Sequence, residues 1–458
     1  MFEKEVYQNR RSRLREEVGH GLLLFIGNNE CGMNYADNTY PFRQDSTFLY
    51  FFGIDRPGLT ALVDVDEGKE MIFGDDPTMD DIVWMGAQPT LRARGERVGI
   101  DRAAPARDLK THVANARARG RVIHYLPPYR ADHYLFLCEL LGMPPAAASL
   151  PFIRAVVNQR NYKSPAEIEQ IEQAVDISAD MHLAAMRLLR PGMKESEIAA
   201  AVTAVALRDG GQLAFPVIAT INGQTLHNHH HHNVTRDGQL FLLDAGAENA
   251  MHYAGDLSST FPVGTRFTEP QKVIYNIALA AHRAAVAALR PGIPFKEVHF
   301  AAAAAIVDGM KEIGLMHGET AAAVQAGAHA LFFPCGTGHM MGLDVHDMEN
   351  LGEEWVGYDG EPKSTLFGLK SLRLARVLEP GFVFTIEPGI YFIPELIDRW
   401  RSEKRFQEYI HYDRIAPYMH VGGVRNEEDY LVTTDGKRRL GKYIPTTVEE
   451  VEQLRGGA

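Results

Sequence analysis

The sequence predicts a smaller N-terminal α/β domain followed by a larger C-terminal α+β domain that contains an internal repeat. The 458 residues of the chain exceed what one ordinary hydrophobic core accommodates. Strand-like and helix-like segments alternate in the first part of the chain, and a similar helix–turn pattern occurs twice further along. We predict the two domains at residues 1–155 and 160–452.

Three short apolar runs predict the strands of the N-terminal domain. They are Gly21–Ile26, Leu59–Val65 and the shorter Glu70–Phe73, and each is bounded by segments of different character. The stretch Met143–Leu150 is rich in proline and alanine and indicates the end of this domain.

The first helix of the C-terminal domain has a clear start signal. Ser164 can cap the helix, Pro165 suits its first position, and Glu167 completes a capping box. Apolar residues then follow at helical spacing. The sequence therefore predicts that a new structural unit begins at this point.

A faint repeat favours two related halves in the C-terminal domain. The predicted helix Glu167–Leu189 ends at Arg190-Pro191-Gly192, and the predicted helix Glu269–Leu289 ends at Arg290-Pro291-Gly292. Helices often end at glycine or proline, so coincidence is the alternative. The same order of helix, stop and acidic–apolar start favours duplication, which would place a site between the halves.

Composition excludes several functional classes. A formal net charge of −12 argues against binding to nucleic acid or to an anionic membrane, and no apolar run is long enough to cross a membrane. Three widely spaced cysteines, Cys31, Cys138 and Cys335, do not indicate a disulfide framework. Together with an N-terminus that lacks an apolar signal, they predict a cytoplasmic location.

Two aspartates lie close together in the sequence after an apolar run. Phe241–Leu243 leads into Asp244, and the segment up to Asp256 is short enough for a β-hairpin centred near Ala250. Residues equidistant from that centre would face each other, with Cβ atoms about 5 Å apart. Two carboxylates there repel by about 3 kcal/mol at an effective dielectric near 20, which a cation would remove. Solvated loop aspartates are the alternative, and the preceding apolar strand argues against them.

Two histidines lie in the glycine-rich segment Gly336–Asp347, at His339 and His346. A lone histidine is more often structural than a metal ligand. Glycines on both sides of His339 allow the backbone to approach closely, which a binding site requires and a core does not.

Two further acidic stretches complete the pattern. Glu387 follows the apolar run 382–386, where a buried charge needs compensation. Acidic residues in Gly422–Tyr430 lie close to Arg425, although this stretch alone fits a solvated sheet edge better.

Together these candidates are four carboxylates and one imidazole, which match the charge of two divalent cations with a bridging hydroxide as the nucleophile. Oxygen-rich ligation with one histidine favours Mn²⁺, with Co²⁺ or Zn²⁺ as alternatives. An aspartic protease is a rival class because Leu243–Ala247 is similar to its Asp-Thr-Gly-Ala signature. Ala245 lacks the required hydroxyl, and no second copy of the signature occurs.

At these five stretches the sequence resembles the Xaa-Pro peptidases of the pita-bread metallopeptidase family, aminopeptidase P and prolidase. The match spans nearly the whole chain and includes the N-terminal segment Tyr40–Phe48. The resemblance implies a pita-bread C-terminal domain, and hydrolysis of the N-terminal Xaa-Pro bond of short proline-containing peptides by a hydroxide that two metal ions activate. It also implies a homodimer or homotetramer.

The resemblance further implies roles for individual residues. Glu387 would transfer a proton, His227 and His346 would act in catalysis and substrate binding, and Arg425 would contact substrate or steady the site. Two of the metal ligands, Asp256 and Glu427, would bridge both ions. The complete implied ligand set is Asp244, Asp256, His339, Glu387 and Glu427.

Three features depart from the family pattern. Cys335 occupies a position where the family usually has histidine, which affects the expected proline pocket. The spacing from Asp244 to Asp256 is one residue longer than usual, which predicts a bulge or a longer turn. The run His229–His232 has no family counterpart, and we interpret it as an exposed loop that binds metal adventitiously.

Different segments of the sequence resemble the two subfamilies, aminopeptidase P and prolidase. Tyr40–Gln44 is more similar to aminopeptidase P, whereas Leu372–Arg376 and Tyr391–Met419 are more similar to prolidase. In prolidases an arginine at the position of Arg373 holds the free carboxylate of a dipeptide; an exposed loop arginine is the alternative. Other readings are a dipeptidase that acts on dipeptides only, a methionine aminopeptidase, and a pita-bread binding protein without metal. The complete ligand set favours an enzyme.

Overall fold

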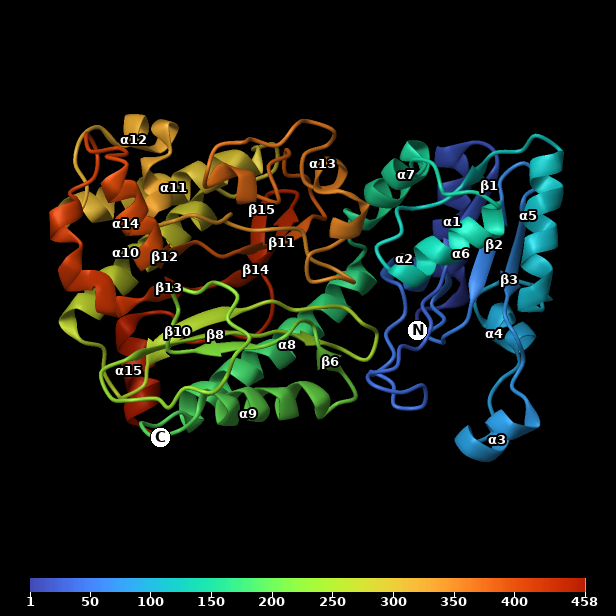
Figure 1. Ribbon diagram of the computed structural model, residues 1–458, viewed down its shortest axis with the longest axis horizontal. Helices are drawn as coiled ribbons and strands as arrows, with labels where there is room; N and C mark the ends of the chain where they lie inside the picture. Colours follow the sequence, from blue (N-terminus) through green and yellow to red (C-terminus); the bar gives the residue numbers. More distant parts are fainter. Residues whose placement is uncertain (458) are drawn as a thin grey trace. The chain divides into compact units, whose positions relative to one another are not determined.

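The computed structural model describes residues 1–457 and consists of two compact units (Figure 1). The first contains Met1–Arg160 and Met348–Trp355, and the second contains Asn161–Asp347 and the chain from Val356 onward. The first unit extends beyond residue 155, where we predicted its boundary, because helix α7 (Leu150–Arg160) packs against its sheet.

The first unit is built on a five-stranded mixed sheet with the order β4-β3-β2-β1-β5. Strand β1 pairs antiparallel with β2 and parallel with β5, and β3 pairs parallel with β4. The three predicted apolar runs form β1, β2 and β3. The strands are β1 (Leu22–Ile26), β2 (Thr60–Asp64), β3 (Lys69–Phe73), β4 (Ala103–Ala104) and β5 (Ile123–His124).

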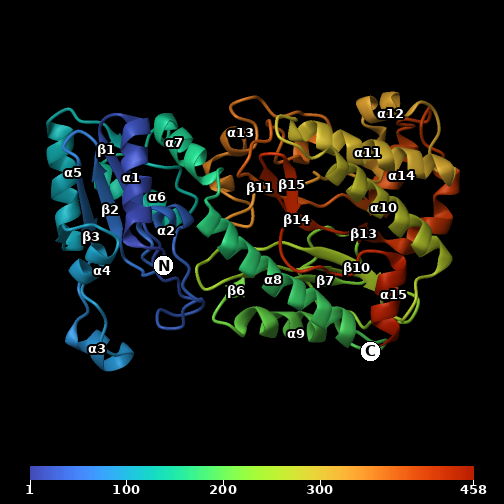
Figure 2. The same ribbon diagram turned by 180° about the vertical axis from the view of Figure 1, so that it is seen from behind.

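Helices cover both faces of this sheet because alternate strand residues point to opposite sides. Leu24 and its same-face neighbours pack against helices α5 (Leu109–Ala118) and α6 (Ala131–Leu141). Phe25, on the other face, contacts aromatic rings of α2 (Ser46–Phe52) and α7. Helix α6 lies in front of the sheet in Figure 1, and α1 (Lys4–Val18) lies in front of it in Figure 2.

Helix α3 (Met79–Met85) projects from the first unit, next to α4 (Leu91–Arg97), and has no buried residue (Figure 2). A Thr78–Asp81 capping box defines its start. Its exposed apolar side chains include Trp84, which is 85% exposed.

The second unit contains two helix pairs, and strands lie between them (Figures 1 and 2). Each pair begins with a capping box and a proline in the first turn, at Ser164 and at Thr268. The pairs are α8 (Pro165–Leu188) with α9 (Glu195–Leu207), and α10 (Glu269–Ala288) with α11 (Phe295–Glu312).

The turn between the helices is the same in both halves. Gly192 and Gly292 adopt left-handed φ values of 94° and 82°, which favour glycine. Each glycine N–H donates to a carbonyl of a distant segment at 2.8 Å, at Thr235 and at Leu378 respectively. An isolated antiparallel bridge follows each turn two residues later. The predicted repeat therefore extends to equivalent long-range contacts.

Short antiparallel sheets fill the interior of the second unit, in the orders β10-β8-β7, β11-β14-β15, β12-β13 and β6-β9. Their strands are β6 (Gln212–Leu213), β7 (Ile218–Thr220), β8 (Leu240–Asp244), β9 (Ala247–Glu248), β10 (Ser258–Pro262), β11 (Val383–Ile386), β12 (Gly389–Tyr391), β13 (Gly423–Arg425), β14 (Glu428–Thr433) and β15 (Gly436–Arg439). The remaining α-helices are α12 (Thr320–Ala326), α13 (Glu353–Val356), α14 (Pro394–Ser402) and α15 (Val448–Gly456). Within residues 1–457, no helix combines the length and apolar character that a membrane span requires.

Candidate metal centre

The predicted metal ligands lie at strand ends in the interior of the second unit. Asp244 is the last residue of β8, Glu387 directly follows β11, and Glu427 lies between β13 and β14. Asp256 lies just before β10, and His339 precedes the bridge that joins its segment to β11. Buried apolar strands thus carry the polar groups into the interior.

The register of the β8–β10 hairpin differs from the predicted one. Asp244 pairs with Ser258, so the hairpin centre lies one residue beyond Ala250, and Asp256 lies two positions before the partner of Asp244. The prediction that the two aspartates face each other was wrong. The connecting turn is irregular, with His252 at a left-handed φ of 66°, so a regular two-residue turn does not set the pairing.

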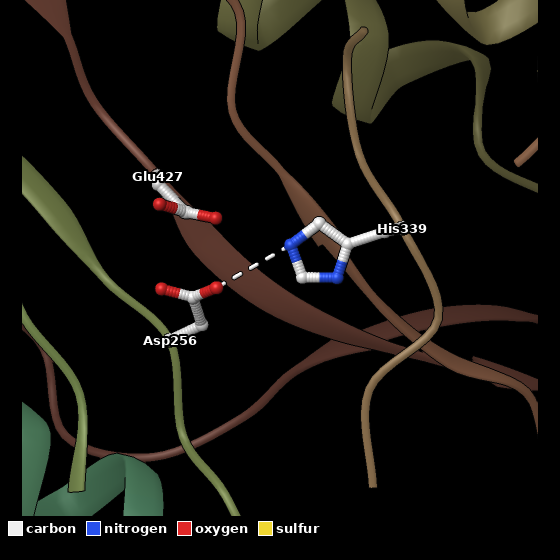
Figure 3. Close-up of side chains that lie close together, drawn as sticks. All are labelled: Asp256, His339 and Glu427. Atoms are coloured by element: carbon white, nitrogen blue, oxygen red, sulfur yellow. Dashed lines mark ion pairs between the residues drawn. The ribbon is translucent and has the colours of Figure 1, made fainter. Parts of the chain in front are cut away.

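Asp256, His339 and Glu427 converge on one point (Figure 3). One ligand atom of each lies within 4.8 Å of the others, and each residue is at most 4% exposed. Nδ1 of His339 lies 3.1 Å from the carbonyl oxygen of Met340. Because a carbonyl only accepts, Nδ1 carries the hydrogen, and the neutral imidazole keeps its Nε2 lone pair. That Nε2 lies 3.3 Å from Oδ2 of Asp256, as a metal-binding arrangement requires.

Glu387 and Asp244 border this cluster. Oε1 of Glu387 lies 3.6 Å from Nε2 of His339, and the Glu387 backbone N–H donates to the carbonyl of Thr337 at 2.8 Å. Oδ2 of Asp244 accepts from Nη2 of Arg425 at 2.5 Å. A carboxylate has two oxygens, so Asp244 can bind Arg425 and a cation at the same time.

The carboxylates raise one another's pKa. Burial raises the pKa of Asp256 well above its ordinary value, and the charge of Asp244 adds to this rise. Burial, followed by the charges of Asp256 and Glu387, raises the pKa of Glu427 in the same way. Within residues 1–457, Oδ1 of Asp256 has no hydrogen-bond partner. Buried carboxylates without donors are unfavourable, and divalent cations would compensate them, so these residues fit a metal centre.

Arg425 connects the cluster to neighbouring strands. Its Nη1 donates to the Tyr391 hydroxyl at 2.8 Å, and its Nε donates to Ser258 Oγ at 2.9 Å. Ser258 Oγ donates in turn to Oε2 of Glu427 at 2.8 Å. Neither Tyr391 nor Ser258 was predicted as a site residue. Their only signal in the sequence is that each lies within four residues of a predicted ligand.

Asp429 supports the backbone behind the cluster and was also not assigned from the sequence. It is fully buried, and its Oδ2 accepts the backbone N–H of Asp256 at 3.1 Å. Burial raises its pKa well above the ordinary value, and the neighbouring Asp256 adds to this rise. Asp429 therefore positions a ligand, and it lies in a stretch where we had assigned Arg425 and Glu427 but not Asp429.

Two of the four predicted substrate-binding residues, His346 and Arg425, contact predicted metal ligands. The ring of His346 packs edge-on against His339, with centroids 4.2 Å apart. Partial burial of the ring lowers the pKa of His227, and the charge of Arg425 lowers it further, whereas the charge of Asp244 raises it. His346 and Arg425 thus contact predicted ligands directly, through the His339 ring and the Asp244 carboxylate.

Cys335, which stands where the family usually has histidine, lies beside the same site. Its Sγ is 4.0 Å from the Tyr391 hydroxyl. Burial raises the pKa of the Cys335 thiol to about 12, and the charge of Glu387 contributes. The thiol is therefore neutral at physiological pH in the metal-free protein, which argues against a role as a nucleophile.

Comparison with known proteins identifies the family of the second unit. Residues 169–434 match the family model described as metallopeptidase family M24, and residues 7–124 match the aminopeptidase P N-terminal domain. The chain belongs to metallopeptidase family M24. The predicted resemblance and the two-part domain composition are thereby confirmed.

Curated relatives of this M24 metallopeptidase match over almost the whole chain. The Xaa-Pro dipeptidase of Homo sapiens is 29% identical and covers 98% of this chain and 91% of the relative. The Xaa-Pro aminopeptidase of Escherichia coli is also 29% identical and covers 98% of this chain and 97% of the relative. Enzymes of both specificities are thus equally similar in sequence.

Solved structures of similar proteins confirm the predicted fold of this M24 metallopeptidase. Proline aminopeptidase P II from Yersinia pestis aligns over 100% of both chains with a TM-score of 0.84 and 27% identity. An Escherichia coli aminopeptidase P variant in complex with substrate aligns with a TM-score of 0.82 and 28% identity, over 100% of this chain and 99% of the other. The protein is a metal-dependent peptidase. The roles of its individual site residues stay predictions.

Proposed function

We propose that this M24 metallopeptidase hydrolyses the N-terminal Xaa-Pro bond of short peptides and accepts both Xaa-Pro dipeptides and Xaa-Pro-Yaa tripeptides. The main support is the buried Asp256–His339–Glu427 cluster with Glu387 at its edge. Chain-long similarity to an Xaa-Pro aminopeptidase and to Xaa-Pro dipeptidases supports the substrate class. The alternative is a strict Xaa-Pro dipeptidase.

We propose two divalent ions as the cofactor, with Mn²⁺ as the native metal. The donor set is rich in carboxylate oxygens and contains one imidazole, which favours Mn²⁺ and leaves Co²⁺ and Zn²⁺ as alternatives. Asp244, Asp256, His339, Glu387 and Glu427 would hold the ions. Bound divalent ions would supply activation of water and polarisation of the scissile carbonyl.

The protein's own side chains would orient the peptide and move its protons. Glu387 is proposed to transfer a proton, because burial raises its pKa above the ordinary value and brings it closer to neutral pH. His227 and His346 are proposed to contact the peptide beside the metal ligands. Arg425 is proposed to hold Asp244 in place through their 2.5 Å ion pair.

A kinetic panel tests the proposed specificity. Metal-free protein is assayed with Xaa-Pro dipeptides, Xaa-Pro-Yaa tripeptides and matched peptides without proline, with Mn²⁺, Co²⁺ or Zn²⁺ added in turn. Cleavage of both proline-containing classes, fastest with Mn²⁺, is expected. Cleavage of dipeptides alone would show that the protein is a strict Xaa-Pro dipeptidase. Preference for peptides without proline would overturn the proposed Xaa-Pro specificity.

Arg373 is expected to distinguish the two substrate classes. A dipeptide presents its carboxylate directly after proline, where an arginine can bind it with charge-assisted hydrogen bonds. Losing such a partner costs roughly 1.5–3 kcal/mol. Arg373→Ala should therefore lower kcat/KM for Xaa-Pro about ten- to a hundredfold, and lower it far less for Xaa-Pro-Yaa.

Arg376→Ala provides the matched control for this change, because Arg376 lies on the same loop and contacts Val356 and Asp359. It should affect both substrate classes equally. If Arg373→Ala lowers kcat/KM equally for both substrate classes, Arg373 does not bind the terminal carboxylate of the dipeptide.

We also propose that the protein forms a homodimer or homotetramer. Helix α3 supports this, because a helix without buried residues that exposes Met79, Val83, Trp84 and Met85 is typical of an interaction surface. Light scattering should give a multiple of the 51.0 kDa chain mass. Val83→Glu with Trp84→Glu should lower that mass, whereas the exposed Asp80→Ser should not.

We also propose that the protein is located in the cytoplasm. Cys31, Cys138 and Cys335 are all free thiols, as expected in a reducing compartment.

A further inference from the structure

A histidine-rich loop between β7 and β8 has no role in the function proposed above, apart from its first histidine. This histidine loop comprises Leu226–Asn233 and forms neither helix nor strand. His227 is the one member with a predicted part in substrate binding. The others are His229, His230, His231 and His232.

Side-chain hydrogen bonds hold the histidine loop against the second unit at its start and centre. Near the start, the Asn228 amide donates to Thr220 Oγ1 at 3.0 Å. At the centre, Nε2 of His231 lies 2.9 Å from the carbonyl oxygen of Val217. Because that carbonyl only accepts, Nε2 of His231 donates and is occupied by this bond.

The end of the loop is held in a similar way. Asn233 donates from its side chain to Oε2 of the buried Glu195 at 2.9 Å, and the backbone N–H of Glu195 donates to the carbonyl of Asn233 at 3.0 Å. Hydrogen bonds at Asn228, His231 and Asn233 therefore anchor the loop at three points.

The exposed histidines form neighbouring pairs two residues apart. His230 and His232 are both exposed, and their ring centroids lie 6.0 Å apart. His227 and His229 form the other pair, at 6.5 Å. Side chains two residues apart point to the same side where a chain is extended, and the 6.0 Å separation places the rings of His230 and His232 next to each other. His231 between them is held by its contact with Val217.

We propose that His230 and His232 form a second, peripheral metal site that binds one Zn²⁺, Ni²⁺ or Cu²⁺ ion. The two imidazoles lie 6.0 Å apart on an anchored loop, so rotation of the side chains would bring both to a common ion, with water completing the coordination. Imidazole ligation suits these metals, whereas carboxylate ligation suits Mn²⁺. The peripheral site shares no residue with the carboxylate cluster. We expect it to prefer Zn²⁺, Ni²⁺ or Cu²⁺, whereas the carboxylate cluster prefers Mn²⁺.

Metal stoichiometry measures this difference directly. Untagged protein is freed of metal and brought to equilibrium by dialysis against Mn²⁺ or against Ni²⁺, and bound metal is measured by elemental analysis. The wild-type protein should bind one more equivalent of Ni²⁺ than of Mn²⁺. The double variant His230→Ala/His232→Ala should lose that additional equivalent and keep its Mn²⁺ stoichiometry and Mn²⁺-supported activity.

A second histidine pair provides the matched control. His317 and His411 stack with centroids 4.1 Å apart on other loops, so His317→Ala/His411→Ala removes two imidazoles elsewhere and should keep the additional Ni²⁺ equivalent. The proposal is overturned if the wild-type protein binds no additional Ni²⁺, if the His230/His232 variant keeps it, or if the control loses it equally. None of these results depends on which peptides the enzyme cleaves.

Discussion

Asp256→Asn is expected to abolish peptidase activity and to lower the amount of bound Mn²⁺. Asp256 lies at the centre of the convergent cluster, 3.3 Å from His339 Nε2, and its Oδ1 has no hydrogen-bond partner within residues 1–457. Asparagine keeps the size of the side chain and removes the charge that would bind a cation. Dialysis followed by elemental analysis, with activity measured over a range of Mn²⁺ concentrations, checks both effects.

A neighbouring residue sets the scale for this loss. Among the predicted ligands, Asp429 contacts only Asp256, whose backbone N–H donates to it at 3.1 Å. Changes to residues that support a metal ligand in this way typically lower metal affinity or activity about 10- to 100-fold. Asp429→Asn should fall in that range, and Asp256→Asn should exceed it. EDTA should inactivate the wild-type protein, and Mn²⁺ or Co²⁺ should restore it. Full activity in protein shown to be metal-free would contradict the proposed mechanism.

The same substitution should have the opposite effect on stability without metal. Burial and the charge of Asp244 raise the pKa of Asp256 well above its ordinary value, so its ionised form is unfavourable in the folded protein at neutral pH. Asp256→Asn removes that buried charge. The Tm of the metal-free variant should therefore exceed that of the metal-free wild-type protein at pH 8.

Local patterns in the sequence predicted much of this architecture. The Ser164 capping box starts helix α8 as expected, because capping depends on residues three apart. The apolar runs before Asp244 and Glu387 are buried strands that end at those acids. Such features depend on neighbours in the chain, so composition and spacing reveal them.

Features that depend on distant pairing were not predictable in this way. The contact of Ser258 with both Glu427 and Arg425 joins segments far apart in the sequence, and no local spacing encodes it. The hairpin register was missed for a related reason. The Asn249 side chain accepts the backbone N–H groups of Met251 and Tyr253 and shapes a turn that simple alternation does not describe.

Glu387→Gln is expected to lower kcat by about 10²–10⁴, the usual contribution of a positioned acid or base, while bound metal is retained. Glu387 directly follows β11, and its backbone N–H is fixed on Thr337 at 2.8 Å, so glutamine can keep the same position. The amide keeps an oxygen for a cation but cannot exchange a proton. Because burial raises the pKa of Glu387, one limb of the pH–rate profile should also disappear.

Glu379→Gln is the matched control. Glu379 accepts the Tyr162 hydroxyl at 2.9 Å and is not a predicted ligand, so this variant should leave kcat unchanged. A Glu387→Gln variant with nearly normal kcat and full metal occupancy would show that another group transfers the proton.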